Sequence, residues 1–417
     1  MQLSAFGEKF TADSGISSLM EDLGAALDED PSLLFMGGGN PGRVDAAQLM
    51  FSQRLKTILD DRDQCHQLLG TYQSPQGDLE FRSALAAYLR QSLGWDLGPQ
   101  HIAVANGSQS AFFVLYNMFA GAMPDGTSRH IHLPLSPEYV GYRDIGLNSN
   151  FFKATRPHVE RGDEGMFKYR IDFDAFAPSD RTGALCVSRP SNPTGNVLSD
   201  DEMSRLDALA REQGVPLIVD GAYGHPFPGL IYTDATPAWN ENTVLMLSLS
   251  KLGLPGVRTG VVVARPDIAH AFARANTVLN LACGTLGPRL IGGMLRDGSL
   301  HMLCKDALQP FYSERRALAL QSVEQGRGDL PVWVHRAEGA FFLWLWCEKL
   351  PIDSLELYAR LKQRGVIVLP GNDFFIGIND EWAHSRECLR LSYAGEPQTI
   401  RAGIALVMDE LHRAYGA

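Results

Sequence analysis

Residues 248–260 read Ser-Leu-Ser-Lys-Leu-Gly-Leu-Pro-Gly-Val-Arg-Thr-Gly and carry the strongest functional signal in this chain. They follow an apolar run at 244–247 and place one lysine beside hydroxyls, an arginine and glycines. The Lys251 amine can form a Schiff base with an aldehyde. The hydroxyls and Arg258 can hold a phosphate, and the glycines let the backbone approach it closely. Short patterns match by chance, so a surface turn that happens to contain a lysine also explains this stretch. The ligand-site interpretation depends on whether upstream segments supply the other parts of a site.

A carboxylate and a tyrosine follow the buried strand predicted at 215–219. That run is apolar on both faces, as in a parallel strand covered by helices. Asp220 comes directly after it, at the strand end where open α/β sheets bind ligands, and Tyr223 follows shortly after. Either residue alone fits an ordinary turn with a packed tyrosine. Together with Lys251 downstream, they indicate a ligand site.

An Asn-Pro-Thr-Gly turn that opens at Asn192 follows the short strand predicted at 185–188. Proline presets one dihedral angle and glycine allows a positive φ, so the turn needs no function to explain it. The spacing from Asn192 to Asp220 fits one crossover between parallel strands. The crossover contains a helix predicted over 200–212, which begins after the cap residue Ser199.

A strand predicted at 102–105 runs into Asn106-Gly107-Ser108-Gln109-Ser110 and then into an apolar helix. This strand, turn and helix start present backbone N–H groups and the positive end of a helix dipole to an anion. Ordinary N-capping by Ser108 uses the same donors. The segment by itself therefore leaves both interpretations open.

In this order, the four segments resemble those of the class I aminotransferases, which are fold-type I enzymes that use pyridoxal 5'-phosphate (PLP). The resemblance spans the chain from Gly39 to Arg390. It implies an α/β fold whose large PLP-binding domain is built on a mostly parallel seven-stranded sheet, with a smaller α+β domain beside it. We expect the large domain over residues 48–293, and the small domain with an N-terminal segment over residues 1–47 and 294–417.

The resemblance also implies a role for each residue of these segments. Lys251 would bind the PLP aldehyde and move a proton, and Asp220 would keep the pyridine nitrogen protonated. Tyr223 and Asn192 would bind the phenolic oxygen of the ring, with Asn192 also touching the substrate. The phosphate would be held by Gly107, Ser108, Gln109, Ser248, Ser250 and Arg258.

Four further positions rest on the resemblance. Tyr139 would stack on the pyridine ring, and Tyr72 would reach across a homodimer interface to the phosphate of the neighbouring subunit. Arg390 lies inside the apolar strand predicted at 388–393, where a buried arginine must be paired. In the family its partner is the substrate α-carboxylate, and Gly39 would offer that carboxylate a backbone N–H. The residues alone also allow a loop tyrosine at 139 and a structural carboxylate beside Arg390.

Within the family, the chain resembles the bacterial valine–pyruvate aminotransferases in residues 6–10, 37–41, 106–113, 226–229, 248–256 and 344–346. That resemblance implies ping-pong transfer of the amino group of L-valine to pyruvate, giving 3-methyl-2-oxobutanoate and L-alanine, in amino-acid biosynthesis. Aspartate-specific relatives bind the substrate side chain with an arginine after the catalytic lysine. The corresponding stretch here, 277–286, has no cation, so we expect it to line a pocket for small or branched apolar side chains.

Two alternatives stay open, and the sequence argues against a third. Another class I aminotransferase for neutral amino acids, or a PLP-dependent β-lyase or decarboxylating enzyme of the same fold, would share the cofactor residues. A regulatory domain that resembles an aminotransferase would carry a DNA-binding module ahead of the fold, and too few residues precede Gly37 for one.

Composition limits the classes of binding partner and the cellular compartment that we expect for the protein. The chain has 417 residues, 45% of them hydrophobic, and a net charge of −11, which argues against a nucleic-acid surface. Its six cysteines have no metal-type spacing and indicate thiols in a reducing compartment. We see no signal peptide and no apolar run of the ~20 residues that a membrane span needs. We therefore expect a cytoplasmic homodimer that binds amino acids and 2-oxo acids and has no metal, nucleic-acid or membrane partner.

Overall fold

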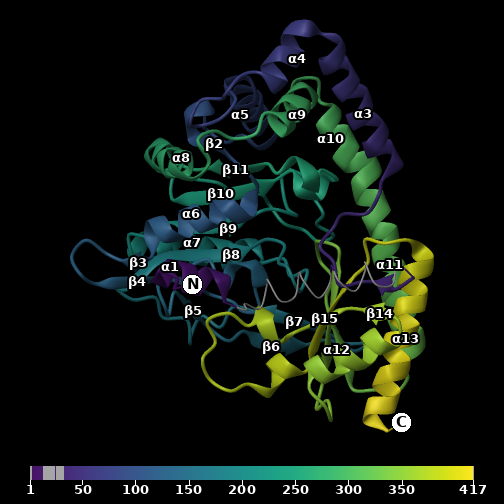
Figure 1. Ribbon diagram of the computed structural model, residues 1–417. Coiled ribbons are helices and arrows are strands. Elements are labelled where there is room, and N and C mark those ends of the chain that lie inside the picture. Colours follow the sequence, from purple (N-terminus) through teal and green to yellow (C-terminus); the bar gives the residue numbers. More distant parts are fainter. Residues whose placement is uncertain (1, 13–23, 25–31, 417) are drawn as a thin grey trace.

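The computed structural model describes residues 2–12, 24 and 32–416 (Figure 1). Residues 13–23 and 25–31 of the predicted N-terminal segment therefore lie outside the described residues. The helices are α1 (Ala5–Thr11), α3 (Asp45–Asp60), α4 (Arg62–Leu69), α5 (Leu79–Leu93), α6 (Ser108–Phe119), α7 (Asp200–Glu212), α8 (Pro266–Asn280), α9 (Leu286–Arg296), α10 (Ser299–Leu303), α11 (Gln309–Arg327), α12 (Ser354–Gln363) and α13 (Pro397–Tyr415). None of the described helices is long and apolar enough to cross a membrane.

The first sheet has a path of seven strands, ordered β2-β11-β10-β9-β8-β4-β3, and an eighth strand, β5, beside β4. Strands β10, β9, β8, β4 and β5 pair in parallel, whereas β11 is antiparallel to both of its neighbours. The prediction of a mostly parallel sheet is therefore confirmed, and the structure adds β5 to the seven strands expected. The bounds are β2 (Ile102–Ala105), β3 (Gly121–Ala122), β4 (Ser128–Leu133), β5 (Phe152–Ala154), β8 (Thr182–Ser188), β9 (Leu217–Asp220), β10 (Thr243–Ser248) and β11 (Gly260–Val263).

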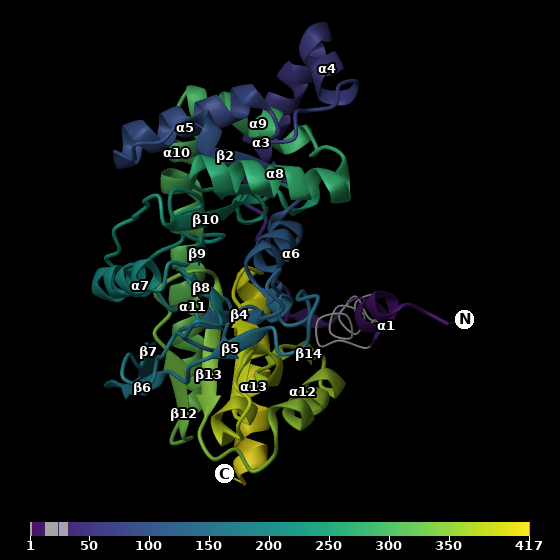
Figure 2. The same ribbon diagram turned by 90° about the vertical axis from the view of Figure 1, so that its left-hand side faces the viewer.

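The central strands are apolar on both faces because helices cover the sheet from both sides. Every residue of β8, β9 and β10 is buried, as expected for a parallel sheet between two helical layers. Figure 2 shows α7 on one side of these strands and α6 on the other. Helix α7 begins as predicted, because Ser199 and Glu202 form a capping box at its first turn.

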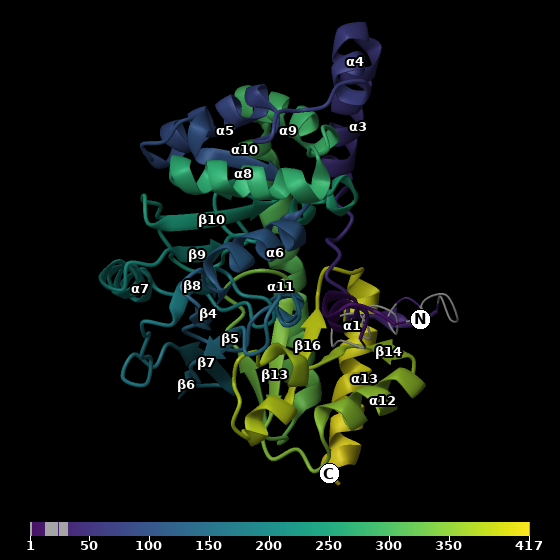
Figure 3. The same ribbon diagram turned by 60° about the vertical axis from the view of Figure 1, so that its left-hand side comes forward.

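A second sheet lies below the first and is flanked by α12 and α13 (Figure 3). Its strand order is β15-β16-β13-β12-β7-β6. A short parallel pair, β1 (Leu34–Phe35) with β14 (Val366–Ile367), joins the N-terminal part of the chain to this region. The bounds are β6 (His158–Arg161), β7 (Met166–Arg170), β12 (Val332–His335), β13 (Phe342–Cys347), β15 (Leu369–Pro370) and β16 (Cys388–Ser392).

The chain enters the second sheet twice. Strands β6 and β7 come from within residues 48–293, yet β7 pairs with β12. The remaining strands of this sheet follow residue 330. The chain therefore passes from the first sheet to the second and back within residues 48–293, which the hydrophobic pattern alone does not reveal. The division of the domains at 48–293 stays a prediction.

Candidate active site

Three neighbouring strands of the first sheet end in polar residues at the same edge. Strand β8 ends at Ser188, β9 at Asp220 and β10 at Ser248, and Ser188 lies directly opposite Asp220 in the parallel register. All three line a cavity of about 430 Å³, at the carboxyl edge where open α/β sheets bind ligands. The predicted site residues that line this cavity are Gly39, Ser108, Gln109, Tyr139, Asn192, Asp220, Tyr223, Ser248, Ser250, Lys251, Arg258 and Arg390.

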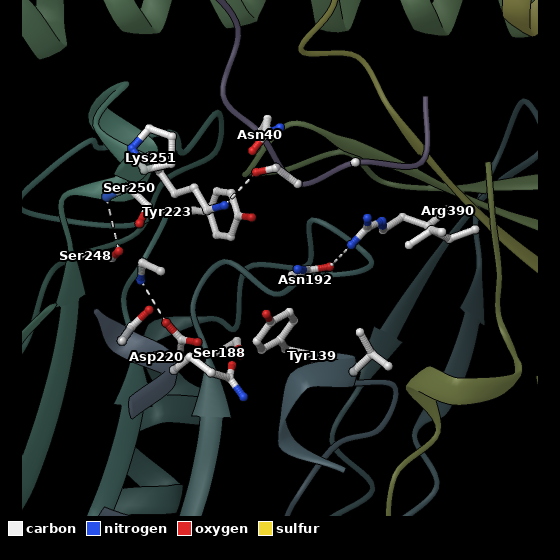
Figure 4. Close-up of a pocket in the computed structure, with 18 of the residues that line it drawn as sticks. Asn40, Tyr139, Ser188, Asn192, Asp220, Tyr223, Ser248, Ser250, Lys251 and Arg390 are labelled. Atoms are coloured by element: carbon white, nitrogen blue, oxygen red, sulfur yellow. Dashed lines mark hydrogen bonds between the residues drawn. The ribbon is translucent and has the colours of Figure 1, made fainter. Parts of the chain in front are cut away.

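Lys251 and Arg390 enter the cavity from opposite sides, with Asn192 and Tyr139 between them (Figure 4). Lys251 lies in a short 3-10 turn (Ser250–Leu252) directly after β10. Its Nζ donates a hydrogen bond to the Gly39 carbonyl oxygen over 2.7 Å and lies 5.2 Å from the centre of the Tyr223 ring. Burial, with Arg390 and Arg258 nearby, lowers the pKa of the Lys251 amine to about 8. A neutral, nucleophilic amine is therefore accessible near physiological pH.

Asp220 is a buried residue of the cavity lining. Its Oδ1 accepts a hydrogen bond from the Ala222 N–H over 2.9 Å, and its Oδ2 accepts one from the Tyr142 hydroxyl. Burial raises the pKa of Asp220, and these two hydrogen bonds, with the nearby Lys251 amine, oppose the rise. A carboxylate held this way favours a positively charged group placed next to it.

The start of α6 and the loop after Lys251 meet around a glycine. Gly107 precedes α6 with a φ of +94°, and a Cβ atom on it would lie 2.2 Å from the Arg258 Nη2 atom. Only glycine therefore allows the guanidinium to approach the helix start this closely. The result is a cation beside free backbone N–H groups, with Ser108 and Gln109 facing the cavity. This arrangement can hold an anion, and the role of these residues in binding a phosphate stays a prediction.

Arg390 is a buried cation without a carboxylate partner among the described residues. Its Nη1 donates to Asn192 Oδ1 over 2.7 Å, and its Nη2 donates to the Gly37 carbonyl oxygen over 2.6 Å. Its guanidinium carbon lies 4.3 Å from the centre of the Phe342 ring. Burial lowers the pKa of Arg390 to about 10. A buried charge satisfied only by neutral groups attracts an anionic ligand.

Gly107 lies beside Arg258 but does not itself line the cavity, and two further predictions fall outside it. Tyr72 is 81% exposed and does not line the cavity of its own chain. The stretch 277–286, expected to line the substrate pocket, is also absent from the lining, and Val278 is 86% exposed. Tyr72 and most of the stretch 277–286 lie on the surface of the chain, apart from the buried Cys283.

Comparison with known proteins agrees with this geometry. The family model for class I and II aminotransferases matches residues 50–406. The chain belongs to the class I and II aminotransferase family. Valine–pyruvate aminotransferase from Escherichia coli (strain K12) is 45% identical over 415 residues, which cover 100% of this chain and 99% of that protein.

Two crystal structures extend the likeness of this aminotransferase to the whole fold. One is a Psychrobacter arcticum 273-4 protein assigned to the amino-acid aminotransferases, with a TM-score of 0.97, 41% identity and coverage of 100% and 99% of the two chains. The other is valine–pyruvate aminotransferase from Salmonella typhimurium LT2, with a TM-score of 0.89, 42% identity and coverage of 96% and 100%.

The cofactor of this aminotransferase family is PLP, and the residues present fit it. Lys251 supplies an amine of lowered pKa for the aldehyde. Asp220 supplies a buried carboxylate for the ring nitrogen. The glycine-lined contact between Arg258 and the start of α6 supplies an anion site for the phosphate. These three groups line one cavity, as the chemistry of PLP requires.

Two residues of this aminotransferase site were missed by sequence reasoning. Tyr142 bonds to Asp220, and Glu138 accepts hydrogen bonds from the Ser188 hydroxyl over 2.6 Å and the Ser188 N–H over 2.9 Å. Both flank Tyr139 in the sequence. A glutamate among apolar residues was the available signal at 138, whereas nothing distinguished Tyr142 from a packed core tyrosine.

Proposed function

We propose that this aminotransferase moves the amino group of L-valine to pyruvate, giving 3-methyl-2-oxobutanoate and L-alanine in a ping-pong sequence. The observation that carries the proposal is its full-length similarity to an enzyme of that name. The cavity supports it with a lysine of lowered pKa and a buried arginine on opposite walls. PLP, when bound, supplies an aldehyde carbon that accepts the amino group and a ring that withdraws electrons.

Lys251 would transfer the proton during the reaction. Its amine, with a pKa of about 8, is suited to take the proton from the substrate Cα as a general base and then to return it as an acid. Asp220, buried and held by two hydrogen bonds, would keep the ring nitrogen protonated. Tyr223 and Asn192 would donate to the phenolic oxygen, and Tyr139 would stack on the ring.

Arg390 would orient the amino acid by its α-carboxylate. Its two terminal nitrogens now donate to Asn192 and Gly37, and the planar guanidinium can bind a carboxylate with parallel hydrogen bonds. Gly39 would add a backbone N–H to the same carboxylate. The phosphate would lie among Gly107, Ser108, Gln109, Ser248, Ser250 and Arg258.

The active unit we propose is a homodimer with composite sites. Several exposed apolar side chains gather at the ends of α4 and α8, and Thr285 ties the two segments together by donating a hydrogen bond to the Leu68 carbonyl oxygen. The Gly284 N–H donates to Asn106 Oδ1 over 2.9 Å, so this surface adjoins the phosphate site. A second copy covering it would bring its Tyr72 toward that site. The exposed residues are Leu69, Tyr72, Val278, Leu279, Leu281 and Leu286.

The six free cysteines, five of them buried, support a reducing, cytoplasmic location for this dimer.

Isotope transfer tests the reaction directly. The PLP-loaded enzyme is given ¹⁵N-valine and pyruvate, and mass spectrometry follows ¹⁵N-alanine and 3-methyl-2-oxobutanoate. We expect both products in equal amounts, with no ammonia released. Lys251→Ala is the control and should give neither product at a comparable rate.

Other outcomes separate the alternatives. Rapid transfer from aspartate or glutamate with valine inert would refute the substrate proposal and leave the family assignment intact. Release of ammonia and pyruvate from 3-chloroalanine, without amino transfer, would favour a β-lyase.

A further inference from the structure

The cavity wall next to Arg390 is apolar. Leu369 in β15 lies directly opposite Arg390 in the antiparallel register with β16. Directly opposite residues of an antiparallel pair point to the same face, with Cβ atoms about 4.5–5.5 Å apart. Both residues line the cavity, and Leu369 is buried inside the protein. A ligand held by the Arg390 guanidinium is therefore beside the Leu369 side chain.

Two more apolar side chains line the same cavity. Phe35 in β1 pairs with Ile367, two residues before Leu369. Its ring packs on Gly38, where a Cβ atom would lie only 2.4 Å from the ring. Val140 directly follows Tyr139, which Figure 4 shows below Asn192, the residue that accepts a hydrogen bond from Arg390. Phe35 and Val140 both line the same cavity.

Within one chain, the described residues that line the cavity leave no cation for a second substrate carboxylate. Among the described lining residues the cations are Lys251, Arg258 and Arg390. The proposed function engages each of them, with the amino group, the phosphate and the α-carboxylate. An acidic side chain placed against the apolar wall would be a buried, unpaired charge, which is strongly unfavourable.

We propose that Phe35, Val140 and Leu369 form the side-chain subsite of the substrate and that it accepts a short branched aliphatic side chain. The inference rests on the proposed function, because Arg390 must hold the α-carboxylate for the side chain to reach this wall. Leu369 sets the length limit, since its position opposite Arg390 is fixed by the β-sheet register.

The test changes the size of residue 369 and measures preference among substrates. Leu369→Ala lengthens the subsite, and Leu369→Phe fills it. In the half-reaction without acceptor, kcat/KM is measured for alanine, valine and leucine. We expect the preference for valine over leucine to fall about tenfold or more in Leu369→Ala. In Leu369→Phe, valine should lose about tenfold relative to alanine, which has no branch to exclude.

Leu389→Ala is the matched control. Leu389 is as buried as Leu369 and adjoins Arg390 in β16, but it points to the opposite face of the sheet. Its substitution removes the same atoms from the sheet and should leave both ratios unchanged. A second readout needs no turnover: 3-methylbutanoate, which is valine without its amino group, should bind more weakly to Leu369→Phe, whereas propanoate should bind equally.

The outcomes distinguish this inference from the function on which it rests. If the wild type does not deaminate valine, the proposed function fails. If the wild type is active and both ratios stay unchanged in the two Leu369 variants, the subsite is wrong and the function stands. If Leu369→Ala does not fold, the Leu369→Phe ratio and the acid-binding comparison decide.

Discussion

Tyr142 donates a 2.5 Å hydrogen bond to Asp220 Oδ2, from a position fully inside the protein. The Tyr142 ring is held by Phe112 and Tyr116, whose ring centres lie 4.9 and 5.3 Å away. The hydroxyl is thus aimed by aromatic packing. Because burial raises the pKa of Asp220 and this bond opposes the rise, Tyr142 helps to keep the carboxylate charged. We regard Tyr142 as a positioning residue for Asp220.

Tyr142→Phe should weaken PLP binding. Loss of a hydrogen bond to a charged group costs about 1.5–3 kcal/mol, which corresponds to roughly ten- to a hundredfold in the PLP dissociation constant. Equilibrium binding to the cofactor-free protein measures it. Tyr116→Phe is the control, because Tyr116 is equally buried but bonds to Cys186. Equal effects of the two substitutions would contradict a specific role for Tyr142.

Glu138→Gln should make stability less sensitive to pH. Burial raises the pKa of Glu138 from its ordinary value of 4.5 to about 8. Between these two pH values, the folded protein keeps the proton on Glu138, whereas the unfolded chain has released it. This contribution to stability is therefore lost as pH rises toward 8. From pH 5 to 8, the free energy of unfolding of the variant should therefore rise relative to that of the wild type, by roughly 1.4 kcal/mol per pH unit. Urea unfolding of the cofactor-free proteins measures it, and parallel curves would show an ordinary pKa.

Lys251→Ala should retain PLP non-covalently through Asp220 and the phosphate site, while steady-state amino transfer collapses. Borohydride reduction of the PLP-loaded wild type, followed by peptide mass spectrometry, should place the pyridoxyl group on Lys251. A label on another lysine would show that the site is misassigned.

Val278→Asp should shift the protein toward monomer and weaken PLP retention, because it buries a charge in the proposed interface. Sedimentation at assay concentration measures the first effect and the PLP dissociation rate the second. Leu355→Asp is the control, since Leu355 is an exposed leucine at the start of α12, in the other part of the fold.

Tyr72→Phe should weaken PLP retention while the dimer persists, if the Tyr72 hydroxyl reaches the partner's phosphate. The wild type itself tests the assembly: a fully active monomer would refute the composite site.

Arg390→Ala should impair all amino-acid substrates alike. Removing one partner of a buried charge pair costs about 2–5 kcal/mol, and every amino acid has the same α-carboxylate. Comparison of kcat/KM for valine, alanine and leucine measures the effect. A loss confined to one side-chain class would indicate that Arg390 contacts the side chain instead.

The local sequence determined the cofactor side of this site. Asp220, Ser248 and Lys251 each follow an apolar run, and Gly107 precedes a helix. The ends of the strands and the turns that follow them could therefore be predicted from the sequence. Parallel strands place their carboxyl ends at one edge, which is why residues far apart in sequence could be predicted to share a cavity.

Only the tertiary structure decided the rest. The pairing of β7 with β12, the Tyr142–Asp220 bond and the position of Leu369 opposite Arg390 depend on register between distant segments. Side-chain patterns specify which face of a strand is buried but not which partner it meets, because many apolar strands are interchangeable in that respect. The sequence therefore determined which chemical groups this protein carries, and the packing of its two sheets decided which of them face each other.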